Sequence, residues 1–411
     1  MKILWLSHLV PYPPKGGVLQ RSYYLLKEVA RHHDVHLLAF NQKDLMKLFY
    51  DTQSSGLKDT QKQLESFCDS VEFANIPCDT NPTQKKMLAL RSIFTKEPYT
   101  INWLESKEFT LLLKKYLAEF DFDFVHFDTI SLAPYLKYCQ EIPTSLDHHN
   151  IESHMLFRRS TKESNFLKKL YFWQEAKRLE KYEQLNCPNF TFHITCSDID
   201  KERLNSLSPD SAVHTIPNGV DIDYFDPEPI SIKEDKLLFV GTLSWYPNIE
   251  AVLFITNEIW PLLKKQMPHV QVDIIGANPP QEIVDLAKSD PNLHIHGFVD
   301  DIRPFFKKSK CYVCPIKDGG GTKLKIIDAL SMGMAIIADE IACEGIDLRN
   351  NKDVIFADTA ESYVEKIVQV LTNDDQRKSL EDKARDRAKE SYSYTSIGED
   401  LSNLYNKYLL N

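Results

Sequence analysis

The stretch from Cys311 to Asp347, CYVCPIKDGGGTKLKIIDALSMGMAIIADEIACEGID, indicates the fold class most directly. It predicts a buried strand, a triple-glycine loop, an amphipathic helix, a second buried strand and an acidic loop. Glycines at the start of a helix let the backbone approach a ligand closely, and the helix N–H groups and dipole favour an anion there. We therefore expect phosphate binding at Gly319, Gly320, Gly321 and Thr322.

Two side chains after the glycines extend this prediction from a phosphate to a phosphorylated sugar. Lys323 adds a positive charge at the start of the helix, and Asp328, further along it, could accept hydrogen bonds from sugar hydroxyls. Together these features favour a nucleotide-sugar. In the alternative interpretation the loop is an ordinary strand-to-helix turn, and Asp328 pairs with Lys325 on the helix surface.

The composition is that of a globular protein of two or three domains, with 411 residues, 43% hydrophobic and 26% charged. A net charge of −10 argues against nucleic acid as a partner. No signal sequence or membrane-length apolar run is evident, so we expect a cytoplasmic protein. Cys311 and Cys314 form a C-x-x-C without a second pair at zinc spacing, so we expect reduced structural thiols and no metal.

Short β-rich runs alternate with longer helical patterns along the whole chain. Several of the runs are continuously apolar, as in parallel strands covered on both faces. The alternation predicts βαβ units, and more than a dozen strands require two sheets. The predicted strands are 2–7, 35–40, 71–76, 124–127, 144–147, 191–196, 213–216, 237–240, 270–275, 293–297, 311–315, 335–338 and 353–356, with helices at 20–31, 249–265, 324–332 and 394–410.

A boundary between the two sheets is expected in residues 216–236, IPNGVDIDYFDPEPISIKEDK, which have no helical period and are rich in proline and aspartate. We expect an α/β protein of two Rossmann-like, doubly wound domains facing a central cleft, with ligands at the carboxyl ends of the strands. The expected domains are residues 1–216 and 217–392, followed by a C-terminal helix at 393–411.

Five ordered segments resemble the retaining glycosyltransferases of family 4, which have the two-domain GT-B fold. Four are MKILWLSHLVPYPPKGGVLQRSYYLLKEVA at 1–30, IPNGVDIDYFDP at 216–227, LLFVGTLSWYPNIEAV at 237–252 and ESYSYTSIGEDLSNLYNKYL at 390–409. The fifth is the triple-glycine stretch with EGID, which falls where the family's donor loop belongs. The resemblance implies metal-independent transfer of a sugar from a nucleoside diphosphate sugar, without a further cofactor. The second domain would bind the donor and the first the acceptor, and the final helix would cross back to the first domain.

The chain departs from the pattern that the resemblance implies. Family members commonly carry two glutamates eight positions apart, where this chain has Gly320 and Asp328. Many also carry an arginine and a lysine after the first strand of the second domain. Here Thr242 follows Gly241, and Asn248 stands near the place of the lysine.

These departures place the sequence nearest a subgroup with W-x-P-N and G-G-G-T-K/R motifs. In that arrangement Lys323 and the loop amides would bind the diphosphate and stabilise it as the leaving group. By the same resemblance, Asn218 would lie at the hinge between domains and Glu344 near the donor. The alternative for Glu344 is a solvated loop acid.

In the first domain, Gly16 and Gly17 follow the first strand and could let the backbone approach a phosphate or sugar, unless they form a plain turn. Arg21, one turn into the next helix, could reach an anion; otherwise it is a solvated surface charge.

Polar residues end the strand in PTSLDHHNIES. We expect Asp147, His148 or His149 to contact the donor sugar or the acceptor hydroxyl, with Asp128 a weaker candidate. In the alternative, one histidine caps the next helix and the others are solvated.

The most basic segment, Met155–Glu183, has eight basic and four acidic residues with aromatic residues between them. A basic amphipathic helix of this kind can lie on an anionic membrane surface, which would suit a lipid-linked acceptor. The interpretation that we favour from the sequence is a core helix with a solvated basic face.

The sequence therefore predicts a retaining glycosyltransferase that acts on a glycan or lipid-linked acceptor in polysaccharide or glycoconjugate biosynthesis. Two alternatives stay open at this point. One is a nucleotide-sugar epimerase of the same fold, and the other is a non-catalytic module that binds a nucleotide or a glycan.

Overall fold

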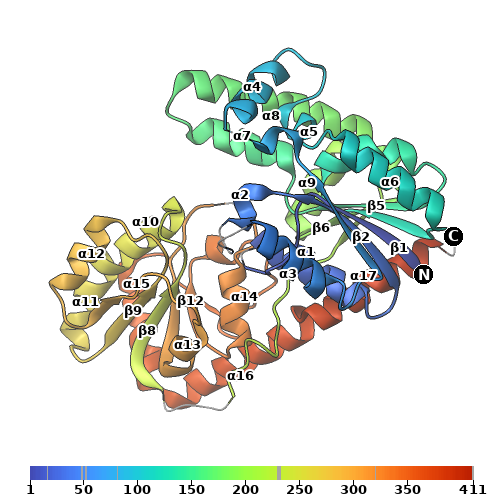
Figure 1. The fold of residues 1–411 in the computed structure, drawn as a ribbon. Helices are drawn as coiled ribbons and strands as arrows, with labels where there is room; N and C mark the ends of the chain where they lie inside the picture. The colour runs from blue at the N-terminus through green and yellow to red at the C-terminus, as the bar shows by residue number, and fades with distance from the viewer. Residues whose placement is uncertain are drawn as a thin grey trace. The chain divides into compact units, whose positions relative to one another are not determined.

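The computed structural model describes residues 1–15, 17–47, 50, 53–80, 82–228, 233–319 and 321–409. Two of the predicted site residues, Gly16 and Gly320, lie outside these ranges. The chain forms two compact units (Figure 1). Unit 1 comprises Met1–Pro217 and Ile397–Asn411, and unit 2 comprises Asn218–Ser396.

Unit 1 is built around a parallel sheet of order β3-β2-β1-β4-β5-β6-β7. Its strands are β1 (Lys2–Ser7), β2 (Asp34–Asn41), β3 (Ser70–Asn75), β4 (Phe124–Phe127), β5 (Thr144–His148), β6 (Phe192–Thr195) and β7 (Val213–Thr215). Its helices are α1 (Gly17–Val29), α2 (Lys43–Met46), α3 (Gln53–Leu64), η1 (Pro77–Thr80), α4 (Pro82–Ser92), α5 (Tyr99–Asn102), α6 (Lys107–Glu119), η2 (Ile130–Tyr138), α7 (Glu152–Lys162), α8 (Phe166–Asn186), η3 (Cys187–Asn189) and α9 (Asp198–Leu207).

Unit 2 has a parallel sheet of order β10-β9-β8-β11-β12-β13. Its strands are β8 (Glu234–Val240), β9 (Gln271–Ile275), β10 (Leu293–Ile295), β11 (Ser309–Cys314), β12 (Ala335–Ala338) and β13 (Ile355–Phe356). Its helices are α10 (Tyr246–Phe254), η4 (Ile255–Ile259), α11 (Trp260–Gln266), α12 (Gln281–Lys288), α13 (Arg303–Lys308), α14 (Leu324–Ser331), η5 (Glu340–Cys343), α15 (Ala360–Thr372) and α16 (Asp374–Ser391), and α17 (Tyr394–Leu409) follows.

These two sheets confirm the expected α/β class with doubly wound parallel sheets. In each sheet the strand order reverses beside the first strand, at β1/β4 in unit 1 and at β8/β11 in unit 2. Ligands of open α/β sheets bind at the carboxyl ends of the strands that flank such a switch point. The fold therefore indicates a candidate site in each sheet, at the carboxyl ends of the two strands that flank the switch point.

The helix predicted at 249–265 is interrupted in the structure. It begins three residues earlier, at Tyr246, and contains the π-helical turn η4 before α11. Pro261 has no N–H to donate within a regular helix, and the wider turn accommodates this loss.

The final helix belongs largely to the first unit. From Ile397 onward α17 is part of unit 1, where the buried Tyr405 hydroxyl lies 2.8 Å from His126 Nδ1. The Tyr405 ring also packs against Phe124 and Phe192, whose centroids lie 4.8 and 6.2 Å away. The last turns of the chain thus complete one face of the first sheet.

Candidate functional site

In unit 2, two glycines at the strand ends of the switch point leave no room for side chains. Gly241 ends β8, and an added Cβ there would lie 2.5 Å from Lys325 Nζ and 2.8 Å from Asn248 Cγ. Gly276 ends β9, and a Cβ there would lie 2.0 Å from the carbonyl oxygen of Gly241. Only glycine fits at both positions, so the backbone itself is presented at this edge.

The loop between β11 and α14 adopts backbone conformations that favour glycine. Gly319 and Gly321 have φ angles of +101° and +73°, and a Cβ on Gly319 would meet the Trp245 ring at 2.9 Å. The hydroxyl oxygen of Thr322 is buried and has no hydrogen-bond partner among the described residues. A ligand that bonds this hydroxyl would satisfy it.

Lys323 and Lys325 make different contacts. Lys323 is the buried N-cap residue of α14, and its ammonium donates to the carbonyl oxygens of Gly319 and Gly321 at 2.7 and 2.9 Å. The Lys323 ammonium therefore holds the glycine loop in place through two of its carbonyl oxygens. The cation beside Gly241 is Lys325, which donates to Asn248 Oδ1.

Two titrating groups lie on the first turns of α14. Burial lowers the pKa of Lys325 to about 8, an effect that Cys314 and Asp328 oppose and Lys323 adds to. Burial also raises the pKa of Asp328 to about 7 against the attraction of Lys325. Within the described residues Asp328 has no side-chain hydrogen bond or ion pair, so the predicted alternative of a Lys325–Asp328 surface pair is not seen.

The remaining predicted residues of unit 2 lie near this edge or at its border. Thr242 is exposed, and its carbonyl oxygen accepts the Asn248 side chain at 2.8 Å. Glu344 follows η5 in the loop after β12, the strand next to β11. Asn218 is the first residue of unit 2 and precedes its first strand.

In unit 1, the switch point carries an ion pair that sequence reasoning missed. His8 directly follows β1 and Asp128 directly follows β4, and His8 Nδ1 lies 2.9 Å from the Asp128 carboxylate. The Ser7 hydroxyl and the His8 backbone N–H also donate to this carboxylate, at 2.6 and 2.9 Å. Burial opposes ionisation of both groups, but their mutual attraction outweighs it, raising the pKa of His8 and lowering that of Asp128.

His149 lies beside this pair, with its ring centroid 5.6 Å from that of His8. Burial lowers the pKa of His149 to about 4, so its ring is neutral at pH 7. Its Nε2 is buried and has no hydrogen-bond partner among the described residues. Glu152, at the start of α7, adds a carboxyl whose pKa burial raises. These groups form a polar cluster in which the His149 Nε2 is unsatisfied.

Asp147 and Arg21 form a buried ion pair with each other. Arg21 Nε and Nη2 each donate to one oxygen of Asp147 at 2.9 Å, and both side chains are almost completely buried. Arg21 Nη1 also donates to the carbonyl oxygens of Ile216 and Pro217 at 2.9 and 3.1 Å. The predicted alternative of a solvated Arg21 is wrong, because α1 packs this helix face against the sheet. Gly17, the first residue of α1, is exposed.

His148 points into the sheet toward His193 rather than to the strand end. Its Nε2 lies 3.1 Å from His193 Nδ1, and His193 Nε2 lies 3.0 Å from the carbonyl oxygen of Cys187. A carbonyl only accepts, so His193 donates from Nε2 and accepts from His148 at Nδ1. Burial lowers the pKa of His148 to about 3 and of His193 to about 4, so both rings are neutral.

Among the residues that the structure describes, two three-residue groups have ligand atoms close enough to hold a metal ion. They are His148, Cys187 and His193, and His8, Asp128 and His149. The His148–His193 and His8–Asp128 hydrogen bonds already occupy one atom pair in each group. The two thiols of the C-x-x-C, Cys311 and Cys314, are buried on β11 and form no disulfide with each other.

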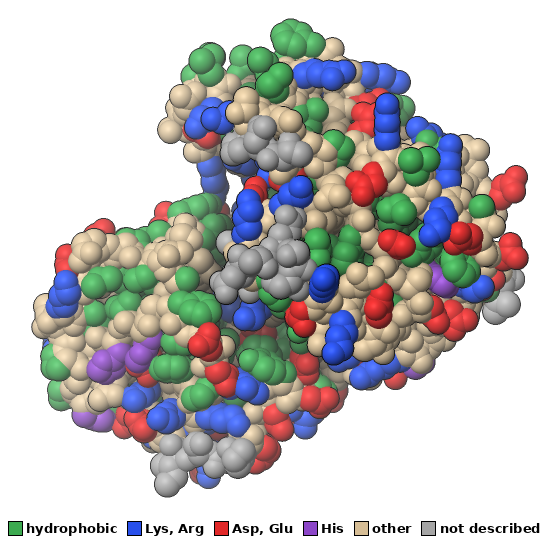
Figure 2. Space-filling model, viewed as in Figure 1, with side chains coloured by type: hydrophobic (Ala, Val, Ile, Leu, Met, Phe, Trp, Pro, Cys, Tyr) green, Lys and Arg blue, Asp and Glu red, His purple; other side chains and the backbone are tan. Residues whose placement is uncertain are grey.

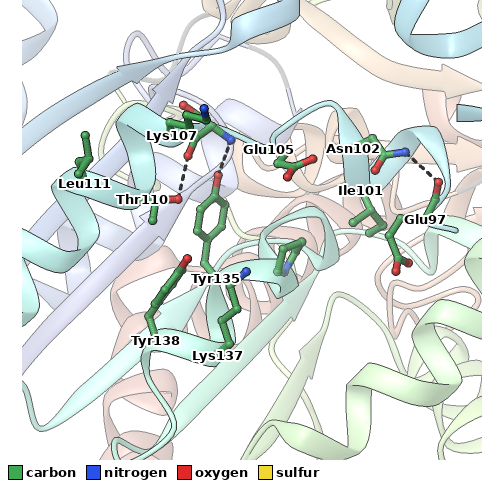
Figure 3. Close-up of a pocket in the computed structure, with 12 residues that line it drawn as sticks. Glu97, Ile101, Asn102, Glu105, Lys107, Thr110, Leu111, Tyr135, Lys137 and Tyr138 are labelled. Carbon is green, nitrogen blue, oxygen red and sulfur yellow. Dashed lines mark hydrogen bonds between the residues drawn. The ribbon is translucent and has the colours of Figure 1, made fainter. Parts of the chain in front are cut away.

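Unit 1 also contains a cavity of about 510 Å³ between α5, α6 and η2 (Figure 3). Tyr135 and Tyr138 line it, and Tyr135 is anchored by donating to the Leu104 carbonyl oxygen at 2.6 Å. None of the predicted site residues is among those that line this cavity. It is therefore separate from the switch-point residues.

Comparison with known proteins matches both units. The family model of glycosyltransferase family 4 matches residues 15–224, and the model of glycosyl transferases group 1 matches residues 234–373. An uncharacterized 44.6 kDa protein in the cps region of Klebsiella pneumoniae is 20% identical over 385 residues, covering 90% of this chain and 91% of that protein.

Solved structures resemble the chain over its whole length. Sucrose-phosphate synthase from Thermosynechococcus elongatus has a TM-score of 0.68 at 15% identity, covering 100% of both chains. TarM has a TM-score of 0.67 at 14% identity, covering 98% of each chain. Alr3699/HepE from Anabaena, in complex with UDP, has a TM-score of 0.63 at 12% identity, covering 99% of this chain and 100% of that one.

At these identities the structural likeness establishes the GT-B fold alone. Membership rests on the sequence models, of which the family 4 model spans just over half of the 411 residues. The protein therefore belongs to glycosyltransferase family 4.

Proposed function

We propose that the protein moves a sugar from a nucleoside diphosphate sugar, bound at the switch point of unit 2, to a hydroxyl of a glycan or lipid-linked acceptor. The observation that carries this proposal is the position of the Lys325 ammonium directly beside Gly241, a residue without a side chain of its own. An anion there would meet the cation and the backbone together. We assign the carboxylate of Asp328, three residues after Lys325 on α14, to the ribose hydroxyls, from which it would accept hydrogen bonds.

Lys325 resolves the departure seen at Asn248. The resemblance implies a lysine near position 248, and this chain has an asparagine there. Lys325 Nζ of α14 donates to the Asn248 side chain, so a lysine from another helix brings its charge to that place. We assign the diphosphate to Lys325 and a loop-holding role to Lys323.

The transfer that we propose retains the anomeric configuration and proceeds on one face of the sugar. The bond from the anomeric carbon to the diphosphate oxygen breaks, and a bond to the acceptor oxygen forms. The acceptor's proton passes to the departing diphosphate, whose developing charge Lys325 and the loop amides stabilise. In unit 1, we assign the unsatisfied His149 Nε2 to a substrate hydroxyl.

Two relatives support the class of donor and product. The Anabaena structures contain UDP and UDP-glucose, and the Klebsiella pneumoniae relative is encoded in a cps region. We accordingly propose a role in polysaccharide or glycoconjugate biosynthesis.

A thermal-shift screen against UDP, GDP, ADP and CMP tests the donor site. We expect one nucleotide to raise the melting temperature by several degrees at about 100 times its Kd, since ligand binding to the folded state stabilises it. The variant Lys325→Met should lose about 10- to 100-fold in affinity for that nucleotide, the value of a charge-assisted hydrogen bond. Lys366→Met, at a partly exposed position of α15, is the matched control and should bind normally.

The product distinguishes the alternative functions. A labelled donor sugar that appears in a glycan or lipid fraction supports transfer, whereas a changed sugar still attached to the nucleotide identifies an epimerase. Binding without either product would overturn the enzymatic proposal and favour a binding module.

A further inference from the structure

The hairpin of α7 and α8 has an exposed apolar tip. On the first half of α8, Phe166 and Leu167 are each 74% exposed, and Leu170 and Trp173 are each 50% exposed. Phe166, Leu170 and Trp173 stand at i, i+4 and i+7, so they share one helix face, with Leu167 beside it. We call these four side chains the hairpin-tip patch.

The second half of the same helix buries one face in the core. Further along α8, Ala176, Leu179 and Glu183 are buried, and Glu175 accepts the Tyr99 backbone N–H at 2.7 Å. The core-helix interpretation favoured from the sequence is therefore correct for the second half of α8 and wrong for the first. Because α8 packs against α7 and yet leaves these four apolar side chains exposed, its exposed face needs another explanation.

The charge around the patch has the opposite sign to that of the whole protein. From residue 158 to residue 173 the hairpin carries five basic residues and one acidic residue, whereas the chain has 49 basic and 59 acidic residues. Lys168 and Lys169 are exposed and have no ion-pair partner within the described residues. Figure 2 shows apolar and basic side chains together over α4, α7 and α8.

A second apolar group lies on the segment joined to α8. Met87, Leu90 and Phe94, on α4 and just after it, are 65%, 63% and 84% exposed. Arg178 of α8 donates to the carbonyl oxygens of Ser92 and Glu97 at 2.6 and 2.9 Å, which fixes this segment against α8. The apolar surface thus extends beyond a single helix.

We propose that the hairpin-tip patch binds an anionic lipid surface. Aromatic and leucine side chains flanked by lysines suit the boundary between headgroups and acyl chains, where the lysines meet lipid phosphates. Protein interfaces are depleted in lysine at their core, and two copies of this patch would oppose like charges. No helix of the described chain is long and apolar enough to cross a membrane, so the contact is peripheral.

Vesicle flotation tests the proposal without nucleotide, so its outcome is independent of the donor site. We expect the full chain to float with phosphatidylcholine vesicles containing phosphatidylglycerol and not with phosphatidylcholine alone, and to be released by salt. The variant Phe166→Ser/Leu167→Ser/Trp173→Ser should bind at least about tenfold more weakly. The control Leu111→Ser/Phe298→Ser removes equally exposed apolar side chains elsewhere and should bind normally.

The lysines are tested separately by charge reversal. Lys168→Glu/Lys169→Glu should weaken binding by roughly twentyfold or more, whereas Lys107→Glu/Lys115→Glu, with two exposed lysines on α6, should not. Addition of anionic vesicles should shift the tryptophan emission to the blue, and Trp173→Phe should remove this shift. Equal binding by the patch and control variants, or a dimer that the patch variant dissolves, would overturn the proposal.

Discussion

The two switch points of the molecule carry different kinds of residues at their strand ends. In unit 2 the strand ends carry glycines, and one cation, Lys325, stands beside bare backbone. In unit 1 the strand ends carry a charged pair, His8 and Asp128, and a neutral His149 with an unsatisfied nitrogen. The same fold therefore lets an anion approach the backbone closely in unit 2, whereas in unit 1 it brings together titratable side chains.

This difference suggests a division of labour that mutation can separate. Changes in unit 2 should alter donor affinity, whereas changes at His8 and Asp128 should alter turnover. The following predictions run from the largest expected effect to the smallest.

Asp147→Ala should cost about 3–5 kcal/mol of unfolding free energy, because it leaves the Arg21 guanidinium buried without its carboxylate. Chemical denaturation measures this loss. Asp301→Ala, which removes a more exposed partner of Arg303, is the control and should barely move the midpoint. A near wild-type stability for Asp147→Ala would show that the Arg21–Asp147 pair does not stabilise the fold. Asp147 would then again be a candidate for contact with the substrate.

Gly241→Val should weaken donor binding by about 100-fold or more, since its side chain would collide with Lys325 and Asn248. Isothermal titration with the nucleotide found in the thermal screen measures the loss. Gly297→Asn is the control on the same sheet, because a Cβ there meets nothing within 4 Å and asparagine tolerates its φ of +66°. Unchanged affinity for Gly241→Val would place the donor elsewhere.

His8→Gln should lower kcat about 10- to 100-fold and leave donor affinity within about twofold, because it removes a charge from unit 1 alone. Tyr138→Ala, in the separate cavity of Figure 3, should change neither quantity. If His8→Gln instead weakened donor binding as much as Lys325→Met, the division between the two units would fail.

Donor affinity should be greatest between about pH 7 and pH 8 and change only a few-fold outside that window. The raised pKa of Asp328, about 7, means that the carboxylate for the ribose forms as pH rises through 7. The lowered pKa of Lys325, about 8, means that the ammonium for the diphosphate is lost above 8. A nucleoside diphosphate sugar, which does not itself titrate in this range, is the probe, and Asp328→Asn should remove the lower limb only.

Much of the fold follows from local sequence. Continuous apolar runs bounded by turn residues predict β1, β4 and β12 to the residue, because these strands are covered on both faces. Gly241 and Gly319 likewise predict positions where other atoms approach the backbone closely. Such features depend on neighbours within a few positions, which a sequence displays.

The site was harder to predict because it depends on adjacency and on helix ends. Nothing in the sequence places His8 beside Asp128; that contact follows from the strand order that sets β1 next to β4. A polar residue immediately after the first strand was the available signal. Similarly, α14 begins at Leu324, which turns Lys323 back to the loop and leaves Lys325 to reach Gly241.

The course of α17 has a consequence for synthesis of the chain. Because Tyr405 fills a buried place against Phe124, Phe192 and His126, the first sheet lacks part of its cover until residues near the carboxyl end have emerged from the ribosome. Domains usually fold in order from the amino end during translation. Here the first unit to be made is the last to be finished, and its uncovered aromatic face is what a chaperone would meet in the interval.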